Sequence, residues 1–167
     1  MTIPAPVHSP VSLYGPLGWT RSSGVEDLLA PFLAGARPAS DFARFEGLGS
    51  EEARALLEIL PEANMRDRQN NGPELVELLA LAAEREGVEL AGYLVSAPRW
   101  DERVSVDGLL VPSCEGLPEP LDSDPLVLAK WAPLQRALGL SSARGAPDEL
   151  VAVRLEGGGR GWWIWWD

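Results

Sequence analysis

The sequence contains few side chains that could act as a nucleophile or a general base near neutral pH. Its only histidine is His8, in a proline-rich N-terminal stretch, and its only cysteine is Cys114. Histidine is the usual general base in this pH range, and a cysteine thiol needs a neighbouring base before it becomes a reactive thiolate. One imidazole and one thiol also supply too few ligands for a transition-metal site. We therefore predict no catalytic residues, no bound metal and no cofactor.

A dense polar run between two expected helices is the strongest polar candidate for a binding site. It reads Arg-Asp-Arg-Gln-Asn-Asn from Arg66 onward. Two guanidinium groups and an amide can hold a phosphate or a carboxylate through paired hydrogen bonds, so Arg66, Arg68 and Asn70 are candidate binding residues. The alternative is that the two arginines pair with nearby Glu62 and Asp67. The sequence leaves both interpretations open.

Two neighbouring carboxylates at an expected hairpin bend form a second candidate. Asp101 and Glu102 follow Trp100 directly. Paired carboxylates carry out acid–base chemistry in glycoside hydrolysis, provided that their separation is right. An aromatic ring beside them could stack on the sugar. The alternative is a solvated hairpin end.

An acidic loop further along the chain could offer oxygen ligands to a hard cation such as Ca²⁺. It contains Glu115, Glu119, Asp122 and Asp124. The glycine-centred spacing of a calcium-binding loop is missing, and Asp124 also suits the cap of a following helix. A metal site is therefore not predicted here.

The C-terminus carries four tryptophans and an isoleucine in one run, from Trp162 to Trp166. Successive side chains of a strand face opposite sides, so Trp163 and Trp165 share one face and the other three apolar residues share the second. One interpretation is a strand in a sheet covered on both faces by helices and the N-terminal arm. The other is that Trp163 and Trp165 form an exposed binding face, because tryptophan is favoured at contact hot spots.

Helical spacing of apolar residues dominates the first half of the chain. Ser23 and the glutamate three residues later form a capping box, and Pro31 should kink the helix that follows. A short turn carrying Phe42 and Phe45 is expected next. Gly87 supplies a left-handed stop to the last helix. The helices predicted in this half span residues 24–35, 51–60 and 73–86, with caps at Ser50 and Asn71 for the last two.

Beyond Gly87 the apolar spacing becomes typical of strands. Gly92 and Gly108 predict a bulge or a close approach within the first two strands, and Gly157 to Gly159 suit a hairpin turn. A helix is expected from Asp124 to Leu138. The predicted strands span residues 88–95, 103–111, 149–156 and 161–167.

These elements predict a single α+β domain. Its mostly antiparallel sheet has about four strands in two hairpins and packs with about four helices, and the N-terminal half is mainly helical. Residues 1–22 are expected to form a proline-rich arm that either docks on the domain or becomes ordered on a partner. Residues 23–167 are expected to form the domain.

Length and composition exclude several classes of protein. A chain of 167 residues suits one domain, and no run of about 18 apolar residues could cross a membrane. Residues 1–10 lack the basic start and apolar core of a secretory signal, so we expect a cytoplasmic protein without membrane contact. The single lysine among 14 basic residues, with abundant Ala, Gly and Pro, is typical of a GC-rich bacterial genome.

The net charge directs the functional prediction. With 25 acidic and 14 basic residues, the formal net charge is −11, which makes direct nucleic-acid binding unfavourable. We predict a small acidic binding protein that associates with a protein partner and inhibits or neutralises it, as immunity proteins do. The first alternative is an enzyme or small-ligand binder that uses arginine and carboxylate side chains. The second is a structural subunit that self-associates in a larger assembly.

Overall fold

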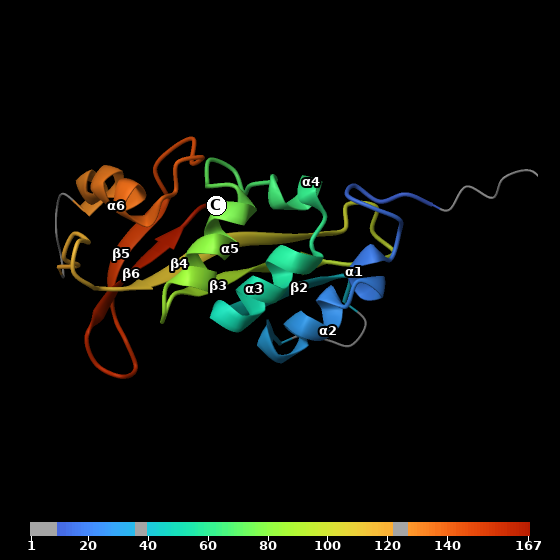
Figure 1. Ribbon diagram of the computed structural model, residues 1–167, viewed down its shortest axis with the longest axis horizontal. Helices are drawn as coiled ribbons and strands as arrows, with labels where there is room; N and C mark the ends of the chain where they lie inside the picture. The colour runs from blue at the N-terminus through green and yellow to red at the C-terminus, as the bar shows by residue number, and fades with distance from the viewer. Residues whose placement is uncertain (1–9, 36–39, 122–126) are drawn as a thin grey trace, which may run out of the picture.

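One antiparallel sheet forms the centre of the molecule (Figure 1). The computed structural model describes residues 10–35, 40–121 and 127–167. The sheet confirms the predicted α+β class, although it has six strands and not about four. In their spatial order the strands are β1 (Leu33–Ala34), β2 (Phe42–Leu48), β3 (Glu89–Val95), β4 (Arg103–Pro112), β6 (Arg160–Trp165) and β5 (Glu149–Arg154).

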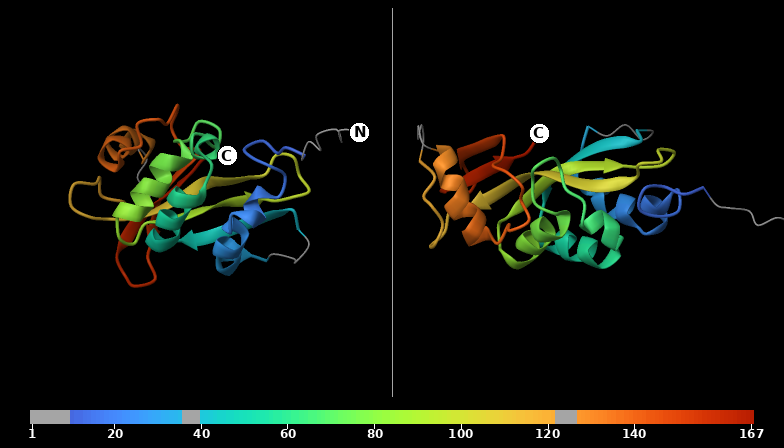
Figure 2. Two further views of the ribbon diagram at one scale, coloured as in Figure 1. Left: turned by 45° about the vertical axis from the view of Figure 1, so that its right-hand side comes forward. Right: turned by 90° about the horizontal axis from the view of Figure 1, so that it is seen from above.

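The helices of the described residues lie on one side of this sheet, as the view from above shows (Figure 2). None of them has the length and apolar character needed to cross a lipid bilayer. They are α1 (Trp19–Ser22), α2 (Val25–Leu29), the 3₁₀ helix η1 (Ala30–Phe32), α3 (Ser50–Ile59), α4 (Glu62–Met65), α5 (Leu75–Glu84), the 3₁₀ helix η2 (Val127–Lys130) and α6 (Trp131–Leu138).

Helices α3 and α5 confirm the predictions for residues 51–60 and 73–86, with the ends moved by one or two residues. Their apolar stripes enter the core at Leu56 of α3 and at Leu78 and Leu79 of α5. Gly87 has a φ of 76°, as the predicted left-handed stop requires. Burial of these stripes against the sheet therefore holds the two helices in place.

The predicted side-chain caps are wrong. The residues at the N-caps of α2, α3 and α5 are Gly24, Gly49 and Glu74, and none of these makes a side-chain cap hydrogen bond. The Ser23 hydroxyl donates instead to the Thr20 carbonyl. The carboxylate of the expected capping box, that of Glu26, accepts hydrogen bonds from Thr20 and Arg21 of the preceding helix α1.

Two predictions near residue 40 are also wrong, because strand pairing overrides the local pattern. The turn expected around Phe42 and Phe45 is strand β2, which pairs with β3 along Phe42–Leu48. Phe45 is fully buried in the core, and Phe42 stacks on Tyr93 of β3 at 5.2 Å between ring centroids. The helix predicted for residues 24–35 ends at Phe32, and the next two residues form β1. The N-terminal half is therefore less helical than expected.

Both predicted hairpins are present. Strand β3 pairs antiparallel with β4, and β5 pairs antiparallel with β6. The register between β3 and β4 shifts between Ala91 and Gly92, so the bulge predicted from Gly92 and Gly108 is confirmed. The predicted start of the next helix at Asp124 lies outside the described residues, and its remainder is η2 followed by α6, which ends before Gly139.

The register of the strands separates two faces of the sheet. One row of partners crosses five strands through Leu48, Leu90, Leu109, Ile164 and Leu150. Each of these side chains is at most 3% exposed, so this row faces the helices and forms the sheet side of the core.

The opposite face carries no helix anywhere in residues 10–35, 40–121 and 127–167 (Figure 2). We call it the open face. In these residues no helix covers the second side of β6, although the interpretation of a strand covered on both sides expects a layer there. The side chains that alternate away from the core belong to this face, and they include Arg44, Tyr93, Leu110, Trp163, Trp165 and Val151.

The described part of the N-terminal arm lies against the β3–β4 hairpin. The Leu13 N–H donates to the Trp100 carbonyl at 2.7 Å, and the Gly18 N–H donates to Glu102 at 2.7 Å. Trp19 belongs to the hydrophobic core. Residues 1–9, with His8, lie outside the described residues.

Candidate functional site

The open face contains a row of side chains that strand pairing brings together from distant parts of the sequence. Glu89 of β3 is paired with Leu110 of β4, Leu110 with Trp163 of β6, and Trp163 with Val151 of β5. In the next row Trp165 lies between Gly108 and Glu149. Trp163 and Trp165 are both partly exposed, whereas Trp162, Ile164 and Trp166 are buried. The alternation predicted for the C-terminal run is therefore present, and Trp163 and Trp165 both lie on the open face.

The indole of Trp163 extends over the backbone of β4. A Cβ atom placed on Gly108 would lie 2.5 Å from Cη2 and 3.1 Å from Cζ2 of this indole. Only glycine leaves enough room for the ring at this position, because real Cβ atoms do not approach other heavy atoms so closely. The close approach predicted from Gly108 is thus an approach of a side chain, and it fixes where the ring lies.

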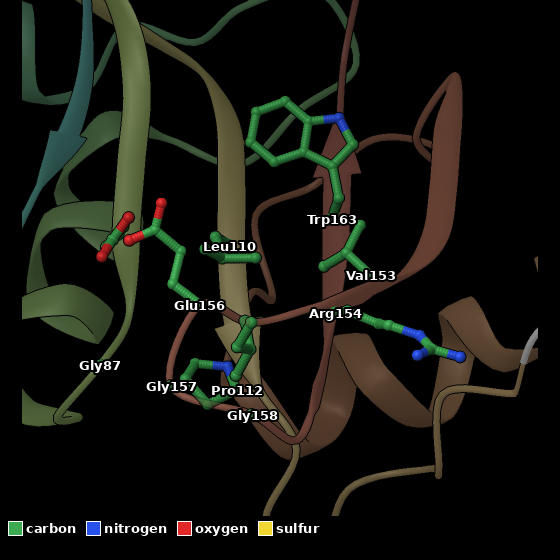
Figure 3. Close-up of a pocket in the computed structure, with 11 residues that line it drawn as sticks. Gly87, Leu110, Pro112, Val153, Arg154, Glu156, Gly157, Gly158 and Trp163 are labelled. Atoms are coloured by element: carbon green, nitrogen blue, oxygen red, sulfur yellow. The ribbon is translucent and has the colours of Figure 1, made fainter.

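A groove of about 630 Å³ lies on the open face beside Trp163. Figure 3 shows the Trp163 indole next to Leu110 and Val153, with Pro112 and the glycines of the β5–β6 turn along one border. We call it the tryptophan groove, lined by Gly87, Glu89, Leu110, Pro112, Val153, Arg154, Leu155, Glu156, Gly157, Gly158 and Trp163. Its sides come from β3, β4, β5 and β6, so the assembled sheet forms it.

The border of the tryptophan groove is acidic. Glu89 and Glu156 are both exposed, and no ion pair within the described ranges involves either of them. Arg154 is the one cation that lines the groove. Its side chain extends away from Glu156 and Trp163 (Figure 3). The groove therefore offers an apolar floor and two carboxylates that form no ion pair with the described part of the chain.

The part of the open face near β2 is internally paired. Arg44 makes two parallel hydrogen bonds to the buried carboxylate of Asp107, at 2.9 and 3.0 Å. These bonds raise the pKa of the Arg44 guanidinium above its ordinary value. Tyr93 lies between the ring of Phe42 and the guanidinium of Arg103, which is 5.4 Å from the Tyr93 centroid. The Tyr93 hydroxyl donates to Gln69 of the polar loop at 2.6 Å. The polar groups of Arg44, Tyr93 and Asp107 therefore have partners within the protein, although a hollow of about 380 Å³ lies beside Phe42 and Arg44.

The arginines of the polar loop are engaged within the protein. Arg66 pairs with Glu62, as one of the two sequence interpretations expected. Arg68 donates to Glu74 and to the carbonyls of Gly72 and Ser142, and its side chain is only 15% exposed. The hollow beside Arg68 has no room for a water-sized molecule.

Asn70, the third candidate of the polar loop, is exposed. Its φ of 47° is a left-handed conformation that asparagine tolerates better than most residues. This conformation accounts for an asparagine at a tight turn without a ligand.

The hairpin candidates likewise have separate roles. Trp100 is 68% exposed at the β3–β4 bend. Asp101 accepts hydrogen bonds from Arg99 and Arg103, and the bonds from Arg99 contribute most to lowering its pKa to about 2. Glu102 is fully buried, where it accepts hydrogen bonds from the Gly18 N–H and the Thr20 hydroxyl.

The polar loop and the hairpin carboxylates therefore do not form one site in the described residues. No described ion pair or side-chain hydrogen bond joins the polar loop to Asp101 or Glu102. The described residues also contain no group of three His, Cys, Asp or Glu side chains placed to bind a metal ion. Cys114 is exposed, with its Sγ 3.7 Å from Arg85 Nη1. In the acidic loop, Asp122 and Asp124 lie outside the described residues.

Sequence reasoning missed Glu89, Leu110 and Glu156. The alternation of β3 and β4 places Glu89 and Leu110 on the outward face, but only the order of the strands shows that this face meets Trp163. Glu156 comes from the turn of the last hairpin, whose path over the sheet is a property of the tertiary structure. Comparison with protein-family models, curated proteins and solved structures finds no match to this chain.

Proposed function

We propose that this chain is a small acidic binding protein that attaches to a basic surface of a protein partner through its open face. The observation that carries the proposal is the row from Glu89 through Leu110 and Trp163 to Val151, which no helix covers in the described residues. Partly exposed aromatic and aliphatic side chains within a polar border have the composition of a contact hot spot. Such a partner could be inhibited or neutralised by occlusion.

The charge supports a basic protein as the partner. The chain has a formal net charge of −11, and Glu89, Glu149 and Glu156 border the two open-face tryptophans. An anionic nucleic acid would be repelled from this border. A basic protein surface would be attracted over a long range and would then bury the tryptophans.

Self-association is the weaker alternative for the same surface. In a symmetric dimer identical patches meet, so the acidic border of one copy would face that of its partner. Val151, which is 46% exposed, is the observation in favour of such a contact. The capture experiment below separates the two cases, because self-association would give a dimer of the pure chain.

The test compares capture by the wild-type chain and by Trp163→Ala/Trp165→Ala. Trp100→Ala is the matched control, because it removes an exposed indole from the opposite end of β4. We expect one basic protein to be retained from an extract of the producing organism. With purified proteins, the double variant should then bind this partner at least about tenfold more weakly than the wild type does. The control should bind it less than about twofold more weakly.

Thermal unfolding of each variant checks that the fold is kept. Equal affinity of the partner for the wild type and the double variant would overturn the proposal. So would a dimer of the pure chain that depends on Trp163 and Trp165 and excludes the captured protein.

A further inference from the structure

We infer that the tryptophan groove receives an arginine side chain from the partner. This inference rests on the proposed function, since it names the part of the partner that the groove would hold. An arginine side chain has an apolar stem and a planar cation at its end. The groove offers a surface for each of these parts.

The apolar floor suits the stem. Leu110 and Val153 lie on either side of β6, and Pro112 continues the floor towards the β5–β6 turn (Figure 3). The three methylene groups of an arginine side chain could lie along these residues. Both the methylene groups and the floor would then be shielded from water. At about 630 Å³ the groove has room for a single long side chain and the backbone that carries it.

The carboxylates suit the cation. Glu89 and Glu156 line the groove and have no ion-pair partner in the described residues. Arg154 extends away from Glu156 (Figure 3). A guanidinium group has five N–H donors in a fixed plane, so it can bond to a carboxylate in the two-pronged geometry that an ammonium group lacks.

The indole favours arginine over lysine. Trp163 is held over Gly108 and remains partly exposed, so its ring is available to a planar cation. Tryptophan is the best aromatic partner for a cation, and guanidinium groups also stack on it through their flat surface. The same ring next to Leu110 would exclude water from one side of the guanidinium.

The test is a titration of the full chain with N-acetyl-arginine amide, followed by NMR of the tryptophan indole N–H groups. The neutral isostere N-acetyl-citrulline amide and the lysine analogue are titrated in parallel. We expect a saturable shift of the Trp163 signal at millimolar concentration, at least about tenfold weaker binding of citrulline and weaker binding of lysine. The indole signal of Trp100, far from the groove, should not move.

Two charge-matched variants locate the carboxylates. Glu89→Gln/Glu156→Gln should weaken arginine binding at least about fivefold. Glu58→Gln/Glu84→Gln removes the same charge from exposed positions on α3 and α5 and should leave the binding unchanged. Equal binding of arginine and citrulline, or equal weakening by both variants, would overturn the inference.

The outcomes also separate this inference from the proposed function. If arginine does not bind while capture of the partner still depends on Trp163 and Trp165, the arginine groove is wrong and the binding protein stands. If arginine binds at Trp163 but no protein partner depends on that residue, the proposed function is wrong and the groove is a site for a small cation.

Discussion

At the scale of single residues, two glycines of the sheet answer different needs. A Cβ on Gly92 would lie 2.0 Å from the carbonyl oxygen of Ser105, which belongs to the paired strand. A Cβ on Gly108 would meet the ring of Trp163, which lies at the end of a side chain that can turn. The first glycine is therefore required by strand pairing, and the second by the position of one indole.

Gly108→Ala is expected to displace the Trp163 ring and to keep the fold. The added methyl group should lower the free energy of unfolding by about 1–3 kcal/mol, as overpacking usually does. It should also shift the Trp163 indole signal in an NMR spectrum and weaken the binding of N-acetyl-arginine amide. Chemical denaturation and the titration above measure the two effects.

Gly157→Ala is the control for ring position and stability only: Gly157 also lines the groove, but nothing lies within 4 Å of the position that its Cβ would take. It should change neither the Trp163 signal nor the free energy of unfolding by more than about 0.5 kcal/mol. If Gly108→Ala behaves like this control, the ring does not depend on Gly108.

At the scale of elements, strand β4 is supported differently along its length. Strand β6 pairs only with Gly108–Pro112, so residues 103–107 have no strand on that side. The fully buried side chain of Asn64 from α4 takes this place. It donates to the Val104 carbonyl at 2.9 Å and accepts from the Val104 N–H at 3.0 Å. One amide thus satisfies both backbone groups of Val104, as a neighbouring strand would.

Asn64→Ala is expected to destabilise the protein by about 2–6 kcal/mol, because it leaves two buried backbone groups without partners at about 1–3 kcal/mol each. The midpoint of unfolding in urea should fall accordingly. Ala63→Asn, an exposed change on the same short helix, should cost less than about 1 kcal/mol. Equal midpoints for the two variants would show that the amide does not support β4.

At the scale of the whole molecule, the two faces of the sheet differ in what they contact. One face packs against the helices and forms the core (Figure 2). The other face contains the tryptophan groove. The net charge of −11 acts over the whole molecule. Under the proposed function it would attract a basic partner before any contact forms, and salt would screen this attraction beyond about 10 Å at 0.1 M ionic strength.

The rate of association with the captured partner is therefore expected to fall at least about tenfold between 0.02 and 0.5 M salt, while the dissociation rate changes much less. Stopped-flow measurement of tryptophan fluorescence gives both rates. An association rate that does not depend on salt would show that the acidic surface plays no part in binding.

The sequence by itself determined the elements whose pattern is local. Periodic apolar residues predicted α3 and α5, and strand-like spacing on each side of a short connection predicted both hairpins. Gly92 and Gly108 predicted the irregularity between β3 and β4. The sequence also predicted that Trp163 and Trp165 share a face. Each of these depends on neighbours within a few residues or on one hairpin, so local chemistry is sufficient.

Only the tertiary structure decided the rest. Strand β2 exists because Phe42–Leu48 pair with β3, more than forty residues away along the chain. The Ser23 capping box is absent because Glu26 bonds to Thr20 and Arg21 of the preceding helix α1, and the packing of α1 against α2 is not encoded in the cap motif itself. Arg68 became a structural residue through Glu74 and Ser142. The tryptophan groove needs the strand order β3-β4-β6-β5, and contacts between segments distant in sequence set that order.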